Sequence, residues 1–267
     1  YALGAYNFCN AETLQASIEE GERRRSPVLL IIGPWEISLL GLPTLMDLVR
    51  SVASQASVPV CLHLDHATDL GLVKDCIEAG FPSVMMDASQ HEFEENVRLT
   101  KAVVEMAKPH GVTVEGELGA VGRVDKLGPE GAEVCTLTDP GKAAEFVRRT
   151  GVDALEVSIG NAHGLYTKRP ELDFERLDAI RKATDVALVL HGGSGTEPDQ
   201  LHRAIALGIC KVNVASELAK AYMQTVGNAA ALGPGKVWYA NAPNDAKKAV
   251  SEVVGRWMDE LGSVGKA

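Results

Sequence analysis

The sequence lacks an excess of basic residues, because 36 Asp and Glu residues outnumber 26 Lys and Arg residues. The formal net charge is -10, whereas nucleic acids and anionic lipid surfaces are bound through clustered Lys and Arg side chains. We therefore expect a small molecule as partner, and neither nucleic acid nor a membrane. Any phosphate on that molecule must be bound by local backbone N-H groups or by a metal ion.

A long apolar run and a cysteine framework are also missing. The longest apolar stretch, residues 28–42, is interrupted by Gly33, Pro34 and Glu36, and falls short of the roughly 18 to 20 apolar residues that a membrane span needs. The five cysteines are odd in number and have no Cys-X-X-Cys spacing, so we expect no disulfide framework. No signal peptide is visible, and we expect a cytoplasmic protein.

Eight short β-branched or aliphatic segments recur along the chain, each followed by a helical pattern, which is typical of βα units and a parallel sheet. The predicted strands are 3–8, 28–32, 58–64, 83–88, 112–118, 154–159, 187–192 and 210–215. Eight units in 267 residues predict a single α/β domain, residues 1–267, folded as a (β/α)8 TIM barrel. The connection 119–138 is long and rich in glycine and charge, so we expect a mobile active-site loop there.

Polar residues gather where the predicted strands end, which is the active face of a TIM barrel. His66, His163 and His191 stand at the ends of three different strands, so their imidazoles can converge on one point. Three imidazoles leave an open coordination position on a zinc ion, as a Lewis-acid site requires. Each histidine alone could be a hydrogen-bonded residue at the barrel rim, but the three together favour a metal site.

Carboxylates accompany these histidines. Asp65 directly precedes His66 and is predicted to transfer a proton to or from a substrate hydroxyl, although it could instead orient a histidine. Asp87 and Glu117 end two further strands. They could hold a second cation, or they could serve as ion-pair and capping partners.

Glycine and serine follow the seventh and eighth predicted strands, the usual phosphate corner of this fold. Residues 192–195, with the sequence GGSG, offer bare backbone N-H groups, and Ser216 stands at a predicted helix N-cap shortly after Asn213. A GGSG segment alone can also form a simple turn. Its coincidence with Ser216 predicts an anion site.

In order and spacing, the segments LDHA, DAS, EGELG, GNAHG, LHGGSG and KVNVASEL resemble the class II, zinc-dependent ketose-bisphosphate aldolases. The resemblance covers nearly the whole chain. Within the family, residues 213–216 are closer to the tagatose-bisphosphate branch than to the fructose-bisphosphate branch. The resemblance implies reversible retro-aldol cleavage of a ketose (bis)phosphate to dihydroxyacetone phosphate and an aldehyde, and a homodimer or homotetramer.

The resemblance also implies roles for individual residues. The three histidines would hold the catalytic zinc ion, Asp65 would exchange the proton of the C4 hydroxyl, and Asp87 and Glu117 match a second metal position. The residues that match the dihydroxyacetone-phosphate pocket are Gly164, Gly192, Ser194, Asn213 and Ser216. The backbone near Gly164 and Gly192 often holds Na+ or K+ in this family. Zinc would polarise the C2 carbonyl and stabilise the enediolate.

The chain departs from the family pattern in three places. Gly33 replaces a serine expected near the substrate, Arg123 adds a cation where the loop loses a glutamate, and residues 241–245 replace a DPR-type stretch. Asp125 could substitute for that glutamate, or Arg123 could meet an acidic substrate group. A second hypothesis therefore keeps the chemistry but changes the substrate to a non-phosphorylated, monophosphorylated or acidic ketose. A non-catalytic sugar-phosphate-binding barrel is a third hypothesis, which the intact Asp65 and histidines disfavour.

Overall fold

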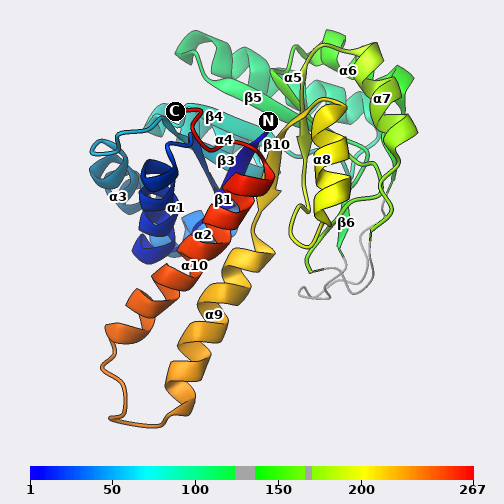
Figure 1. The fold of residues 1–267 in the computed structure, drawn as a ribbon. Coiled ribbons are helices and arrows are strands. Elements are labelled where there is room, and N and C mark those ends of the chain that lie inside the picture. Colours follow the sequence, from blue (N-terminus) through cyan, green and yellow to red (C-terminus); the bar gives the residue numbers. More distant parts are fainter. Residues whose placement is uncertain (124–135, 166–169) are drawn as a thin grey trace.

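Eight parallel strands close into a barrel in the order β1-β10-β9-β7-β5-β4-β3-β2 (Figure 1). The computed structural model describes residues 1–123, 136–165 and 170–267. The barrel strands are β1 (Leu3–Asn7), β2 (Val28–Ile32), β3 (Val60–Ala67), β4 (Ser83–Met86), β5 (Thr113–Leu118), β7 (Ala154–Val157), β9 (Ala187–Leu190) and β10 (Ile209–Val214). This barrel confirms the predicted single-domain α/β fold of the TIM-barrel type.

Helices surround the barrel and cover the outer face of its strands (Figure 1). They are α1 (Ala11–Arg24), α2 (Pro34–Leu40), α3 (Leu42–Ala53), α4 (Leu70–Ala79), α5 (Phe93–Ala107), the 3-10 helix η1 (Lys108–His110), α6 (Pro140–Thr150), α7 (Phe174–Ala183), α8 (Pro198–Ala206), α9 (Ser216–Ala231) and α10 (Asn241–Glu260). Two short strands, β6 (Gly122–Arg123) and β8 (Ala162–His163), pair with each other outside the barrel sheet.

Local sequence signals set several helix ends. The side chain of Asn10 accepts a hydrogen bond from the backbone N-H of Thr13, while the Thr13 hydroxyl accepts one from the backbone of Asn10, and this reciprocal pair starts α1. Asp139 caps α6 by accepting from the backbone N-H of Lys142 at 2.9 Å. These caps satisfy N-H groups that have no partner within the helix.

The barrel strands are buried on both faces, because they pack inward on one another and outward on the helices. Leu30, Ile31 and Ile32 of β2 are each at most 1% exposed, which explains why this segment is a continuous apolar run rather than an alternating one. Throughout the described parts of the chain, no helix has both the length and the apolar character needed to cross a membrane.

The predicted loop 119–138 lies mostly outside the described residues. Its two ends meet through backbone hydrogen bonds between Ala120 and Thr136, and the backbone N-H of Thr138 donates to the carbonyl of Ser158 at 2.9 Å. The loop therefore starts and ends beside the carboxyl ends of β5 and β7. Asp125 and the side chain of Arg123 also lie outside the described residues, so their roles stay predictions.

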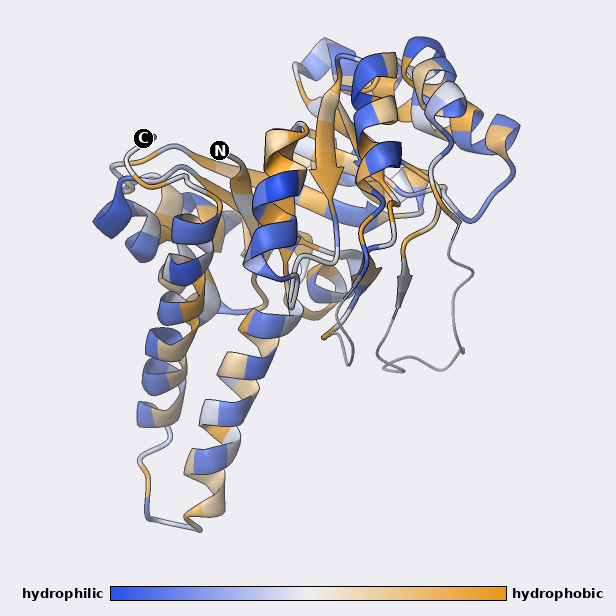
Figure 2. Cartoon of the chain, turned by 45° about the vertical axis from the view of Figure 1, so that its right-hand side comes forward, coloured by the Kyte–Doolittle hydropathy of each residue, from blue (hydrophilic) through white to orange (hydrophobic). Residues whose placement is uncertain are grey.

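Helices α9 and α10 form a hairpin, the arm, that projects away from the barrel (Figures 1 and 2). The barrel end of α10 packs on α1 and buries Val254 and Trp257, which are at most 2% exposed. The far end of the arm carries exposed apolar side chains, with Leu232 at 63%, Trp238 at 66% and Tyr239 at 79% exposure. The arm is therefore anchored at one end and leaves apolar surface uncovered at the other.

Candidate metal centre

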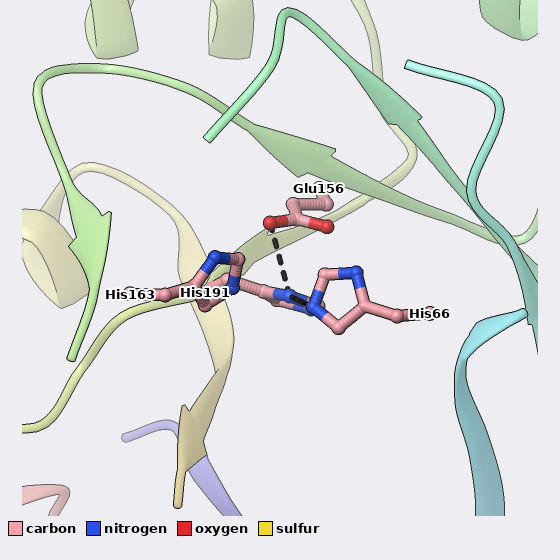
Figure 3. Close-up of side chains that lie close together, drawn as sticks. All are labelled: His66, Glu156, His163 and His191. Atoms are coloured by element: carbon pink, nitrogen blue, oxygen red, sulfur yellow. Dashed lines mark hydrogen bonds and ion pairs between the residues drawn. The ribbon is translucent and has the colours of Figure 1, made fainter. Parts of the chain in front are cut away.

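Three histidines converge at the carboxyl ends of β3, β8 and β9 (Figure 3). The ring centroid of His66 lies 4.9 Å from that of His163 and 4.7 Å from that of His191, and the rings of His163 and His191 are 5.8 Å apart. One nitrogen of each ring and one carboxylate oxygen of Glu156 all lie within 4.8 Å of one another. A single cation placed among these four atoms can contact all of them.

The backbone at His66 is irregular. His66 has φ of 49°, in the left-handed region that residues other than glycine rarely adopt. The pairing of β3 with β4 also shifts register between Leu64 and Ala67. This irregularity lies at the strand end that carries both Asp65 and His66, as backbone strain at functional sites commonly does.

Two of the histidines are oriented by carboxylates on the side away from the centre. Nδ1 of His66 lies 2.9 Å from Asp87, and Nε2 of His191 lies 3.0 Å from Glu115. We assign the ring proton to each of these nitrogens, because a carboxylate accepts it there, and this leaves lone pairs on His66 Nε2 and His191 Nδ1. Those two nitrogens face each other at 2.9 Å.

Two lone pairs at hydrogen-bond distance need a positive charge between them, either a proton or a metal ion. The pKa values agree with this need. Burial would lower the pKa of His66, but neighbouring carboxylates, chiefly Asp65 and Asp87, outweigh burial and raise it to about 10. Burial and then the nearby His66 charge keep the pKa of His191 well below its usual value. The residues therefore fit a cation at this point, and the nitrogen-rich donor set suits zinc.

The two predicted carboxylates of the second metal position surround the other side of His66. Asp87 Oδ2 and Glu117 Oε2 lie 2.9 and 3.8 Å from Nδ1 of His66, and the three residues form a second group of potential ligands. His66 belongs to both groups through its two nitrogens. The structure thus brings Asp87 and Glu117 to the site, where they orient His66, and their role as a second metal position stays a prediction.

Sequence reasoning missed Glu156, which lies in the middle of the predicted strand 154–159. It is fully buried in β7, and its Oε1 lies 3.0 Å from Nδ1 of His191. Burial, followed by the negative charges of Glu117 and Asp87, raises its pKa well above the usual value. One signal in the sequence could have indicated Glu156: it is a glutamate between apolar residues in a strand expected to be buried. A buried carboxylate is costly unless a cation or a hydrogen-bond donor balances it.

Asp65 is held beside the histidines by the end of β10. Its Oδ1 accepts a hydrogen bond from the side-chain amide of Asn213 at 3.0 Å and lies 4.0 Å from Nε2 of His191. Burial raises the pKa of the Asp65 carboxyl. A carboxyl with a raised pKa that still borders a cavity is suited to receive and return a proton.

Beneath the histidines, Lys211 forms a buried ion pair with Glu115, with Nζ 2.8 Å from Oε2. Because Glu115 also accepts from His191, the lysine positions a carboxylate that in turn positions a histidine. His63 is buried beside Glu115, with its Nε2 3.7 Å from Oε2, and its Nδ1 lies 2.7 Å from the Ser83 hydroxyl. Burial lowers the pKa of His63 to about 3, so it is neutral.

A cavity of about 380 Å³ opens beside the histidines and is lined by Asp65, His66 and His163. All five residues predicted to contact dihydroxyacetone phosphate line it as well: Gly164, Gly192, Ser194, Asn213 and Ser216. The structure therefore gathers the predicted substrate residues in one cavity, next to the candidate metal ligands.

The predicted anion corner is formed by the loop after β9 and the start of α9. Ser216 is the first helical residue of α9 and Ala215 occupies the N-cap, so the prediction of Ser216 as N-cap was wrong by one position. Alanine has no side-chain hydrogen-bond acceptor, so the N-cap residue Ala215 does not cap the first turn of α9. The Ser194 hydroxyl accepts from the backbone N-H of Glu217 at 3.3 Å and links the two segments.

Comparison with known proteins agrees with this geometry. Residues 1–266 match the model of the class-II fructose-bisphosphate aldolase family. The YdjI aldolase from Escherichia coli K12 is 36% identical, with a TM-score of 0.87 over 100% of this chain and 93% of that chain. A proposed fructose-1,6-biphosphate aldolase from Coccidioides immitis is 32% identical, with a TM-score of 0.88 over the same shares. The barrel, the cavity and these matches together show that the chain belongs to the class II aldolase family and is an aldolase, a carbon-carbon lyase.

Proposed function

We propose that this chain is a zinc-dependent aldolase that reversibly cleaves a ketose phosphate to dihydroxyacetone phosphate and an aldehyde. The observation that carries the proposal is the pair of imidazole nitrogens of His66 and His191, which face each other at 2.9 Å beside a cavity that Asp65 also lines. Tagatose bisphosphate and fructose bisphosphate both fit this chemistry. Membership in the tagatose-bisphosphate branch stays a prediction from residues 213–216.

The histidines His66, His163 and His191 would hold the zinc ion, with the Glu156 carboxylate at the same point. A zinc ion bound there supplies a Lewis acid for the substrate carbonyl. Asp65 accepts the proton of the substrate C4 hydroxyl during cleavage and returns it during condensation. The amide of Asn213 fixes one carboxylate oxygen of Asp65, so the other oxygen is available to the hydroxyl.

The corner formed by Gly192, Ser194 and Ser216 would bind the phosphate of the dihydroxyacetone half. An added Cβ on Gly192 would lie 2.0 Å from the carbonyl oxygen of Ala162, so only glycine lets these two loops approach so closely. The first turn of α9, whose cap residue Ala215 has no side-chain acceptor, would contribute N-H groups and the positive end of the helix dipole. The Na+ or K+ ion expected near Gly164 and Gly192 belongs to this same corner.

A panel of ketose bisphosphates, ketose monophosphates and free ketoses tests the proposal. We expect the zinc-loaded protein to release dihydroxyacetone phosphate, measured by a coupled assay, and a chelator to abolish the release until zinc is restored. Release that persists after verified metal removal would contradict the metal dependence. No release from any member of the panel would contradict the aldolase assignment of this site.

We also propose that the chain forms a homo-oligomer through the arm. The exposed Trp238 and Tyr239 lie with ring centroids 4.9 Å apart at its far end, and large apolar side chains at such exposure are typical of protein interfaces. Sedimentation analysis of the wild type and of a Trp238→Ser/Tyr239→Ser double variant tests this. We expect a dimer or tetramer that the double variant weakens, and a monomeric wild type would contradict the proposal.

A further inference from the structure

The cavity beside the histidines has two chemically different sides. The side formed by the ends of β9 and β10 carries the hydroxyls of Ser194 and Ser216 and the first turn of α9. The side formed by the ends of β1 and β2 is lined by Asn7, Gly33 and the first turn of α2. The first side is suited to a phosphate, and the second side decides what the other half of the substrate can carry.

The only charged side chain that the β1–β2 side presents to the cavity, within the described residues, is Glu36 on α2. No Lys or Arg is among the described residues that line the cavity. The side-chain amide of Asn7, a neutral donor on this side, donates to Oε1 of Glu36 at 3.3 Å and to the carbonyl of Ile31 at 3.4 Å. The protein therefore uses this donor to hold a carboxylate in the cavity wall.

Gly33 provides the space for this carboxylate. An ideal Cβ built on Gly33 would lie 3.0 Å from Oε2 of Glu36, which is closer than ordinary van der Waals contact. The serine expected at position 33 is thus replaced by a residue that lets Glu36 approach the backbone. At this side of the cavity the chain therefore lacks the expected hydroxyl and places the Glu36 carboxylate close to the backbone of residue 33.

The rim of the same side is aromatic. Trp35 lines the cavity and is 83% exposed, so its indole ring is accessible to a ligand that enters. An exposed ring offers an apolar face to the C-H groups of a hydroxylated carbon chain, while the neighbouring carboxylate accepts hydrogen bonds from its hydroxyl groups. A phosphate at this position would instead be repelled by the negative charge of Glu36, beside which the described lining of the cavity places no Lys or Arg.

We propose that Glu36 is a specificity-determining residue that selects an uncharged, polyhydroxylated aldehyde half and disfavours one that ends in a phosphate or a carboxylate. This inference rests on the proposed aldolase function and narrows its substrate to a ketose with a single phosphate, on the dihydroxyacetone half. Among the hypotheses drawn from the sequence, it favours the monophosphorylated ketose over the bisphosphate and the acidic sugar.

The test is condensation of dihydroxyacetone phosphate with pairs of aldehydes that differ only in a terminal phosphate, such as glyceraldehyde and erythrose with their phosphorylated forms. The measured quantity is the ratio of kcat/KM for the unphosphorylated aldehyde to kcat/KM for the phosphorylated one. We expect a ratio above about 10 for the wild type, and a fall of about 10-fold in Glu36→Gln, because the substitution removes the charge but keeps the shape.

Each ratio is internal to one protein, so a smaller fraction of folded or zinc-loaded variant does not alter it. Asp47→Asn is the matched control, because Asp47 is exposed on α3, lies outside the cavity lining and removes the same charge. The control should keep the wild-type ratio. A wild type that prefers the phosphorylated aldehydes, or a Glu36→Gln variant with the wild-type ratio, would overturn this inference alone. No consumption of dihydroxyacetone phosphate with any aldehyde would overturn the proposed function, and this inference with it.

Discussion

Glu20 on α1 and Glu156 on β7 are both buried, with exposed fractions of 4% and 0%, yet their surroundings shift their pKa values in opposite directions. Glu20 accepts hydrogen bonds from the guanidinium groups of Arg23 and Arg24 and from the hydroxyl of Ser251 on α10. Burial would raise its pKa, but the two arginines outweigh burial and lower it. The protein thus balances this charge with its own side chains.

Glu156 receives no such balance. Within the described residues it forms no ion pair with Lys or Arg, and its neighbours are His191 and the carboxyl groups of Glu117 and Asp87. Burial and these carboxyl groups raise the pKa of Glu156, while burial and then Asp87 raise the pKa of Glu117 to about 8. The difference teaches that a buried carboxylate left without a protein cation marks a place for an external one, whereas a paired carboxylate serves the fold.

If carboxylates at the site serve the chemistry and paired carboxylates serve the fold, the largest effect on catalysis is expected at Asp65. In Asp65→Ala we expect kcat to fall by about 10²- to 10⁴-fold, the usual contribution of a general base, with little loss of thermal stability. Coupled release of dihydroxyacetone phosphate, zinc content and the melting temperature are the measurements. Wild-type turnover in this variant would show that another group takes the proton, and a large drop in melting temperature would show that Asp65 serves the fold.

A smaller effect on zinc is expected at Asp87, which orients His66 from outside the centre. Asp87→Asn keeps a hydrogen-bond acceptor for His66 Nδ1 but loses the charge, and we expect zinc affinity to fall by about 10- to 100-fold. Competition with a chromophoric chelator measures this affinity. An unchanged affinity would mean that the carboxylate does not act through the histidine.

On the other side of the comparison, Glu20→Gln should reduce the free energy of unfolding by about 2 kcal/mol near pH 7, because charged hydrogen bonds are lost. Since the folded pKa of Glu20 is lowered, its contribution is present above the unfolded pKa of about 4.3 and disappears as pH falls through the folded pKa. Denaturant titrations of both proteins at several pH values should therefore converge in acid. A stability difference that grows toward acid would contradict the sign of this shift.

The smallest expected effect concerns the packing of α10 on the same carboxylate. A Cβ added to Gly255 would lie 2.1 Å from Oε1 of Glu20, so Gly255→Ala must displace a paired side chain, and we expect a loss of about 1 kcal/mol. Gly227→Ala is the control, because Gly227 is on the exposed part of α9 with nothing within 4 Å of an added Cβ. Thermal denaturation should show destabilisation only in the first variant. Equal melting temperatures for Gly255→Ala and Gly227→Ala would mean that α10 does not pack tightly against the Glu20 side chain.

The eight barrel strands were predictable because apolar segments alternate with helical patterns throughout the chain. The end of β3 was predicted too early, at residue 64 instead of Ala67. Asp65 and His66 are polar, and polarity at a strand end indicates a loop unless the residues face a buried site. The short strands β6 and β8 were not predicted, because their formation depends on contacts between loops. The helix α2 was not predicted either: Pro34 in its first turn is a common start signal, but the helix has only seven residues.

The candidate site was predictable to the extent that its residues stand at strand ends. The three histidines, Asp65 and the cavity-lining glycines and serines do so, and the structure brings them together. Glu156 and Glu115 lie inside strands, where orientation toward the barrel interior depends on the register of the closed sheet. Glu36 was also missed as a site residue, because α2 was not foreseen and its first turn faces the cavity only once β1 and β2 are paired.

Closure of the barrel by β1 and β10 has a consequence for how the chain folds as it is synthesised. Leu3 pairs with Lys211, about 200 residues later, so one edge of β1 has no strand beside it until β10 is made. At about 5 to 20 residues per second, the ribosome needs about 10 to 40 s for that interval. An unpaired strand edge invites association with other chains, so we expect the growing polypeptide, rather than the finished enzyme, to be the aggregation-prone species and the one that needs a chaperone.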